Sequence, residues 1–329
     1  MTDWRSQRDA ALMDLDGEQR TEQVRLQAAV ALYDLAAEDD ARWSEMAAVL
    51  PRLLASKVSG VRRTGVALAA LILDKSESEG LIAARLSDEA EEVRMEAAGQ
   101  LADLATPTIR ASLAAALNDT SFAVRFEAAR GMAAVQHSAR LEVLVEALEH
   151  AHLRYRALGA LADLGDARAL PALQKLFGRW FLPYFERTQA AGALVKLGDA
   201  SAAAHLLSRT KRRWGFSADR PLAIELCGEV KVPGAFERLT ELLRDKGDSE
   251  ACRGAAARGL GRLGDARAVP PLVEVLEDAA SSDDLKLDAA EGLCRLKLPE
   301  ARAHVERVLP AIGSKETRDE MAGMLEERS

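Results

Sequence analysis

The stretch CRGAAARGLGRLGDARAVPPLVEVL, residues 252–276, decides the fold of this chain. Leucines stand seven and ten positions after Arg253, a spacing that keeps their side chains on one stripe of an α-helix. Gly264 can adopt the left-handed backbone conformation that ends a helix, and Asp265 can cap the next one. Prolines near a helix start cost little, because the first N–H groups have no partner within the helix. The stretch therefore predicts a helix, a tight turn and a second, shorter helix.

The same motif recurs along the chain. Residues 153–176 read LRYRALGALADLGDARALPALQKL, and most copies carry small residues three and four positions after a basic anchor, where a second helix must approach closely. The anchors recur at intervals of 29 residues, from Arg125 to Arg154, up to 37 residues, from Arg25 to Arg62. A period of this length predicts an all-α fold, an α-solenoid built as a superhelical stack of about ten two-helix repeats. The anchors are Arg25, Arg62, Arg94, Arg125, Arg154, Arg187, Arg220, Arg253, Lys286 and Arg318.

A repeat of this kind cannot bury its apolar face alone, so the two ends of the stack need caps. We expect an N-terminal capping helix within residues 1–20 and a C-terminal capping helix within residues 314–329. The repeat array then occupies residues 21–313.

The motif Val-Arg-x-x-Ala-Ala-x-x-Leu, followed by Leu-Gly-Asp-Ala-Arg-Ala-Val-Pro-Pro-Leu, resembles the HEAT-like repeats first described in phycobilin lyases, over residues 21–329. The resemblance implies a right-handed superhelix, with the anchor-bearing helices (A helices) on the convex side and the shorter helices that follow them (B helices) lining a concave groove. It also implies a hydrogen-bond ladder between repeats, formed by the anchor arginines with Asp88, Asp119 and Asp265. The repeat is shared by adaptors, scaffolds and a few enzymes, so the resemblance leaves the function open.

Charge and composition narrow the class of protein. The formal net charge of −8 and the pI near 5.4 disfavour nucleic acid and anionic lipid as partners. The first residues contain no apolar signal segment, and no 18 uncharged apolar residues run together, so we expect neither export nor membrane spanning. Three widely spaced cysteines are typical of reduced thiols, which favours a cytoplasmic location. Frequent Arg and Ala favour a bacterial source.

The sequence offers no catalytic constellation. None of the five histidines has a metal-binding or catalytic spacing, and the His-Glu pairs of the iron-dependent hydroxylase built on this repeat are absent. The Gly-x-Gly at residues 259–261 falls inside a helical pattern rather than after a strand. We therefore expect no catalytic residue, no cofactor and no metal.

One region departs from the repeat pattern. Seven of the fourteen aromatic residues fall between positions 177 and 216, and residues 175–220 carry nine basic against three acidic residues. This composition suits a hot spot for an acidic or phosphorylated segment of another protein. The alternative is an irregular repeat junction, packed by Phe177, Phe181 and Phe185. The candidate binding residues are Arg179, Trp180, Tyr184, Lys211, Arg212, Arg213 and Trp214, and exposure of Trp180 and Trp214 would favour the binding site.

Three functions remain open at this point. The first is a non-catalytic protein-binding scaffold or adaptor that uses the concave groove of the solenoid. The second is an enzyme similar to the bilin lyases and isomerases, which only the resemblance of the repeat supports. The third is a nucleic-acid-binding HEAT protein that uses region 175–220, which the negative net charge disfavours.

Overall fold

A computed structural model describes residues 3–135, 140–211 and 218–326. Over these residues the chain forms α-helices and short 3₁₀ helices and contains no β-strand, so the predicted all-α solenoid is confirmed. The chain divides into two compact units, Met1–Leu164 and Gly165–Ser329, and each is described by itself.

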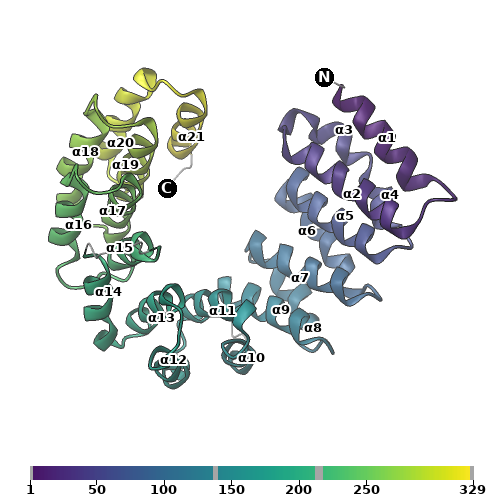
Figure 1. The fold of residues 1–329 in the computed structure, drawn as a ribbon, viewed down its shortest axis with the longest axis horizontal. Coiled ribbons are helices and arrows are strands. Elements are labelled where there is room, and N and C mark those ends of the chain that lie inside the picture. Colours follow the sequence, from purple (N-terminus) through teal and green to yellow (C-terminus); the bar gives the residue numbers. More distant parts are fainter. Residues whose placement is uncertain (1–2, 136–139, 212–217, 327–329) are drawn as a thin grey trace. The chain divides into compact units, whose positions relative to one another are not determined.

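The first unit holds eleven α-helices among its described residues (Figure 1). Its A helices are α2, α5, α7, α9 and α11. The full order is α1 (Trp4–Asp16), α2 (Glu22–Ala37), η1 (Asp40–Arg42), α3 (Trp43–Ala47), α4 (Leu50–Leu54), α5 (Ser59–Ile72), α6 (Lys75–Ala83), η2 (Ala84–Ser87), α7 (Glu91–Leu104), α8 (Ile109–Ala116), α9 (Phe122–Ala134), α10 (Leu141–Ala147) and α11 (Ala151–Leu164).

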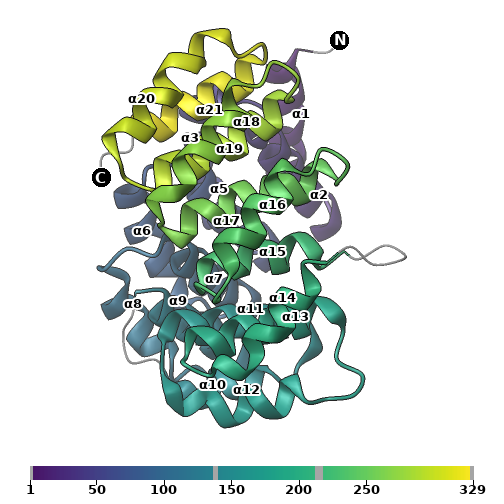
Figure 2. The ribbon, with the colours of Figure 1, turned by 90° about the vertical axis from the view of Figure 1, so that its left-hand side faces the viewer.

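The second unit, which Figure 2 turns toward the viewer, continues the alternation of helices. Its A helices are α13, α15, α17, α19 and α21. The full order is η3 (Ala167–Ala169), α12 (Leu170–Phe177), α13 (Tyr184–Lys196), η4 (Ala200–Ala202), α14 (Ala203–Arg209), α15 (Arg220–Glu229), α16 (Ala235–Arg244), α17 (Glu250–Leu263), η5 (Ala266–Ala268), α18 (Val269–Glu277), α19 (Asp283–Arg295), α20 (Pro299–Val308), η6 (Leu309–Ala311) and α21 (Lys315–Glu326).

The Gly-Asp turns have the predicted geometry. The three turn glycines all have positive φ angles, 69° at Gly165, 100° at Gly198 and 74° at Gly264. The aspartate after each glycine accepts a backbone N–H two residues later and so caps the 3₁₀ turn that opens the B helix. Residues no more than three positions apart therefore set the direction in which each B helix leaves its A helix.

The resemblance assigned the wrong layer to the concave side. In both units consecutive A helices pack closely, with direct backbone contacts between α7 and α9 and between α17 and α19, whereas consecutive B helices contact each other far less. A β-carbon on Gly131 of α9 would lie 3.0 Å from Cα of Ala102 in α7, and one on Gly261 of α17 would lie 2.6 Å from Cα of Gly292 in α19. The layer with the closer spacing is the inner one in a curved stack, so the A helices form the concave side of each unit. Figure 1 shows α16 and α18 along one side of the second unit, and α15, α17 and α19 along the other.

The ladder of anchor arginines is present, with one correction. Arg94 donates from Nε to Asp119 Oδ2 at 2.7 Å and from Nη1 to the carbonyl oxygen of Asp88 at 3.0 Å, so it joins two successive turns. Arg62 binds Asp88 in the same way, which confirms both predicted aspartates. Asp265 is the wrong partner, because its carboxylate caps η5 and pairs with Arg267 of its own turn.

The ladder position in the second unit belongs instead to Asp248. This residue precedes α17, and its carboxylate accepts from both terminal nitrogens of Arg220. The other described anchor arginines donate to main-chain carbonyls of the preceding loop or helix end, as Arg125 does to those of Asp119 and Thr120.

Helices lie where the two caps are expected, α1 at the beginning and α21 at the end of the described chain. Their capping role stays a prediction. None of the described helices is both long and apolar enough to cross a membrane.

Candidate partner-binding site

Three aromatic side chains between α12 and the first turn of α13 point into solvent. Trp180 is 88% exposed, Phe181 is 92% exposed and Tyr184 is 72% exposed. We call these three residues the aromatic patch. Large aromatic side chains normally bury most of their surface, so a cluster of them in solvent marks an interaction surface.

The loop that carries the patch is tied to α13 by the repeat's own anchor. The guanidinium of Arg187 donates to the carbonyl oxygens of Phe177 and Arg179, both at 2.5 Å, and to that of Trp180 at 3.4 Å. The side chain of Leu182 is buried at the other end of the loop. Trp180 and Phe181 are therefore held outward by a fixed backbone.

Tyr184 rests on a buried ionic cluster. The guanidinium carbon of Arg209 lies 5.1 Å from the centre of the Tyr184 ring, within cation–π range. Nε of Arg209 donates to Asp219 at 2.8 Å, and the Thr188 hydroxyl donates to the same carboxylate oxygen at 2.7 Å. Arg209, Asp219 and Thr188 are all buried. The tyrosine ring therefore lies over a guanidinium group whose own position is fixed by a buried ion pair.

The junction-packing interpretation holds for one of its three phenylalanines. Phe177 is half-buried, and its ring lies perpendicular to that of His205 with 5.2 Å between the ring centres. Phe181 is 92% exposed and does not fill the junction, whereas Phe185 is 41% exposed. The aliphatic side chains of Leu176 and Leu182 are buried there instead.

The basic residues of the region divide into two groups. Lys211 is exposed and Arg179 is half-buried, whereas Arg212, Arg213 and Trp214 lie outside the described residues. Other bases serve the fold: Arg187 holds loop carbonyls, Arg209 pairs with Asp219, and Arg220 pairs with Asp248. The excess of basic over acidic residues therefore overstates the charge available to a partner. The repeat register could have predicted this structural role for Arg187 and Arg220, because both residues occupy the anchor position of their repeats.

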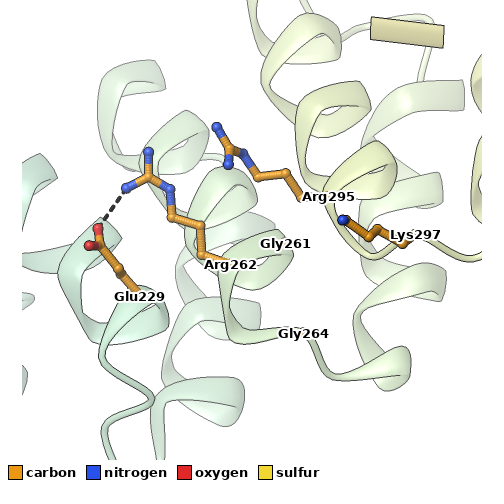
Figure 3. A pocket seen from close by; sticks show the side chains of 6 residues that line it. All are labelled: Glu229, Gly261, Arg262, Gly264, Arg295 and Lys297. Atoms are coloured by element: carbon orange, nitrogen blue, oxygen red, sulfur yellow. Dashed lines mark hydrogen bonds and ion pairs between the residues drawn. The ribbon is translucent and has the colours of Figure 1, made fainter. Parts of the chain in front are cut away.

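The sequence interpretation missed a second feature, on the A-helix layer of the second unit. A pocket of about 570 Å³ is lined by Glu229, Gly261, Arg262, Gly264, Arg295 and Lys297 (Figure 3). We call it the basic pocket, because three of its six lining residues are cationic and one is acidic. No local sequence motif predicts the basic pocket, because its residues come from the ends of three different helices.

The residues with catalytic or metal-binding potential stay apart in the part of the chain that the structure describes. No three His, Cys, Asp or Glu side chains there are grouped as a metal site requires. Cys227 and Cys252 are buried free thiols, and Cys294 is half-buried. Burial raises the pKa of the Cys227 thiol to about 12, which keeps it protonated and unreactive at neutral pH.

A family model described as HEAT repeats matches residues 78–153 and 215–294, and one described as the PBS lyase HEAT-like repeat matches residues 153–178. The chain is a HEAT-repeat protein. The aromatic patch begins just after the last residue matched by the second model, so this HEAT-repeat protein leaves the repeat pattern where it exposes its aromatic side chains.

Several solved structures are similar to this HEAT-repeat protein at low identity and with TM-scores below 0.5. The CpcE–CpcF complex of phycocyanin lyase from Nostoc sp. is 23% identical, with a TM-score of 0.48 over 71% of this chain and 94% of that one. An engineered protein is 19% identical, with a TM-score of 0.40 over 100% of this chain and 97% of that one. Human deoxyhypusine hydroxylase in complex with glycerol is 20% identical, with a TM-score of 0.32 over 77% and 98%. No curated protein sequence matches this chain.

Proposed function

We propose that this HEAT-repeat protein is a non-catalytic scaffold that binds another protein through the aromatic patch. The observation that carries the proposal is the exposure of Trp180, Phe181 and Tyr184 on a loop whose backbone is fixed by Arg187. Rigid aromatic side chains lose little conformational entropy on binding and dominate the energy of protein interfaces.

The position of the patch changes the expected mode of binding. The loop between α12 and α13 joins a B helix to an A helix, so it runs along the rim between the two layers. The proposed contact therefore begins at the rim of the second unit rather than on the concave face. Exposed Lys175 and Lys211 lie in the same region of the sequence and suit an acidic or phosphorylated segment of the partner.

The two other functions have less support. The PBS lyase model matches one repeat, residues 153–178, and describes the repeat rather than a reaction. Visible absorbance on mixing the protein with a bilin would reveal chromophore binding. Nucleic-acid binding would depend steeply on salt and weaken when Lys211, Arg212 and Arg213 are neutralised.

Affinity capture tests the scaffold proposal. The wild-type chain and the double variant Trp180→Ser/Phe181→Ser are immobilised and exposed to an extract of the native cell, and the captured proteins are quantified by mass spectrometry. The matched control is Met13→Ser, which removes an exposed apolar side chain (75% exposed) from α1 in the first unit.

We expect one specific protein to be lost from the double variant by about tenfold or more and kept by Met13→Ser, since hot-spot truncations cost at least about 2 kcal/mol. The interaction is then reproduced with the purified partner. Identical captures by all three chains would rule out the aromatic patch as the binding site.

A further inference from the structure

The basic pocket lies where three A helices end. Glu229 is the last residue of α15, Gly261 and Arg262 belong to the last turn of α17, and Arg295 ends α19. Figure 3 shows the side chains of Arg262 and Arg295 extending side by side from neighbouring helices, with Glu229 facing Arg262. The volume of about 570 Å³ falls in the range of small-ligand sites.

The close approach of α17 and α19 brings the two arginines together. A β-carbon on Gly261 would lie 2.6 Å from Cα of Gly292, so the two backbones touch directly beside the pocket. Arg262 and Arg295 occupy the same register 33 residues apart, and they therefore project from adjacent positions. Two like charges in this arrangement repel each other unless an anion lies between or beside them.

The carboxylates of Glu225, Glu229 and Glu291 balance the formal charge of the three cations, but they do not occupy every donor atom. Arg262 is paired on both terminal nitrogens, with Glu225 and Glu229 at 2.8 Å each. Arg295 is held through Nε by Glu291 at 2.8 Å, and no ion pair within the described residues involves its terminal nitrogens. Lys297 is exposed and likewise has no ion pair among those residues. The two terminal nitrogens of Arg295 and the ammonium group of Lys297 thus have no carboxylate partner among the described residues.

Lys297 occupies an unusual backbone position. Its φ angle is 55°, in the left-handed region, where the equivalent residues are Gly165, Gly198 and Gly264 in three repeats and Ala105 and Lys231 in two others. A side chain in this conformation is strained relative to glycine. The lysine places an ammonium group beside the pocket at the expense of that strain.

We propose that the basic pocket binds a phosphate monoester dianion. The free fork of Arg295 can hold two phosphate oxygens in the bidentate manner, and Lys297 supplies the second positive charge. Gly261 and Gly264 line the basic pocket without side chains, so they leave space for a ligand between the cations. This site lies outside the aromatic patch and does not depend on the protein-binding function.

Calorimetric titration with phenyl phosphate, at constant ionic strength, tests the proposal on the full chain. We expect saturable binding with a dissociation constant of about 1 mM. Arg295→Gln and Lys297→Gly should each weaken binding about tenfold, because each removes one charged contact.

The matched control is Lys231→Gly. Lys231 also has a positive φ angle, 52°, at the equivalent helix end one repeat before Gly264, but it does not line the pocket. Both Lys→Gly variants relieve the same strain and remove the same charge from a helix C-terminus, so they should unfold at similar denaturant concentrations. Only Lys297→Gly should lose phosphate affinity.

A phosphoserine peptide, titrated in parallel, distinguishes the source of the phosphate group. Tighter binding of the peptide than of phenyl phosphate indicates a phosphorylated protein segment, and the reverse indicates a small molecule; both outcomes support the site. The proposal is overturned if the wild type shows no saturable binding of either probe, or if Lys231→Gly weakens binding as much as Lys297→Gly. A failed capture experiment at the aromatic patch would leave this outcome unaffected.

Discussion

Gly228 of α15 and Gly259 of α17 meet backbone to backbone: a β-carbon on Gly228 would lie 1.9 Å from the carbonyl oxygen of Gly259. No flexible side chain is available to move aside, because the obstructing atom belongs to the main chain of the neighbouring helix. This contact sets the spacing of α15 and α17 within the A-helix layer of the second unit.

Replacing Gly228 with alanine should lower the free energy of unfolding by about 3 kcal/mol, since the two helices must move apart to admit the methyl group. Urea denaturation followed by circular dichroism measures the change. Gly323→Ala in α21 is the control, because no atom lies within 4 Å of the position its β-carbon would take. That substitution should stabilise the helix by about 0.5–1 kcal/mol through its higher helix propensity. Equal effects of the two substitutions would contradict the close contact.

Asp248→Asn tests the corrected ladder. The Asp248 carboxylate accepts from Nη1 of Arg220 at 2.8 Å, and both side chains are at least nine-tenths buried. Removing the negative charge leaves a buried guanidinium without its counter-ion, so we expect a loss of about 3 kcal/mol in unfolding free energy. Asp265→Asn should change stability little, because its ion pair with Arg267 is exposed and asparagine also caps helices. A larger loss of stability in Asp265→Asn than in Asp248→Asn would instead support Asp265 as the partner of an anchor arginine.

The Arg94–Asp119 pair predicts a specific dependence on pH. Its hydrogen bonds from Arg94 hold the pKa of Asp119 below the ordinary value for aspartate, even though partial burial opposes this. A depressed pKa in the folded state stabilises the fold above the unfolded-state pKa of about 3.9, and this contribution disappears as the pH falls through the folded-state value. The difference in stability between wild type and Asp119→Asn should therefore be full at pH 6 and smaller at pH 3.

Urea midpoints measured at both pH values provide the check. The same comparison made in an Arg94→Gln background isolates the pair, because the pH-dependent difference should largely vanish without the arginine. A difference that persists unchanged in that background would assign the effect to another group.

Deletion of residues 314–329 should lower the melting midpoint. Met321 of α21 is buried, and Nη2 of Arg302 donates to the Leu325 carbonyl, so the deletion exposes apolar surface on the preceding repeat. The single substitution Met321→Ala should cost about 2–3 kcal/mol by opening a cavity at the same place. An unchanged midpoint after the deletion would argue against a capping role for this helix.

Much of the local structure could be predicted because its causes lie within a few residues. The positive φ at Gly264 and the cap formed by Asp265 follow from a tripeptide, and the buried positions of α17 follow from the helical period. The candidate site could be predicted only in outline. Composition placed aromatic and basic residues together, but it could not tell exposed Phe181 from half-buried Phe177, or the available Lys211 from Arg209 in its buried pair.

The sequence by itself determined the repeat, the helices and the turns, because each depends on residues three to ten positions apart on one segment. Tertiary structure alone decided which layer is concave, which aspartate completes each rung of the ladder, and that Arg262 and Arg295 share a pocket. These features depend on residues about one repeat apart, whose side chains meet only once neighbouring helices have packed. The distance between neighbouring helices is set by the smallest side chains between them. The pattern of residues along the sequence does not specify that distance.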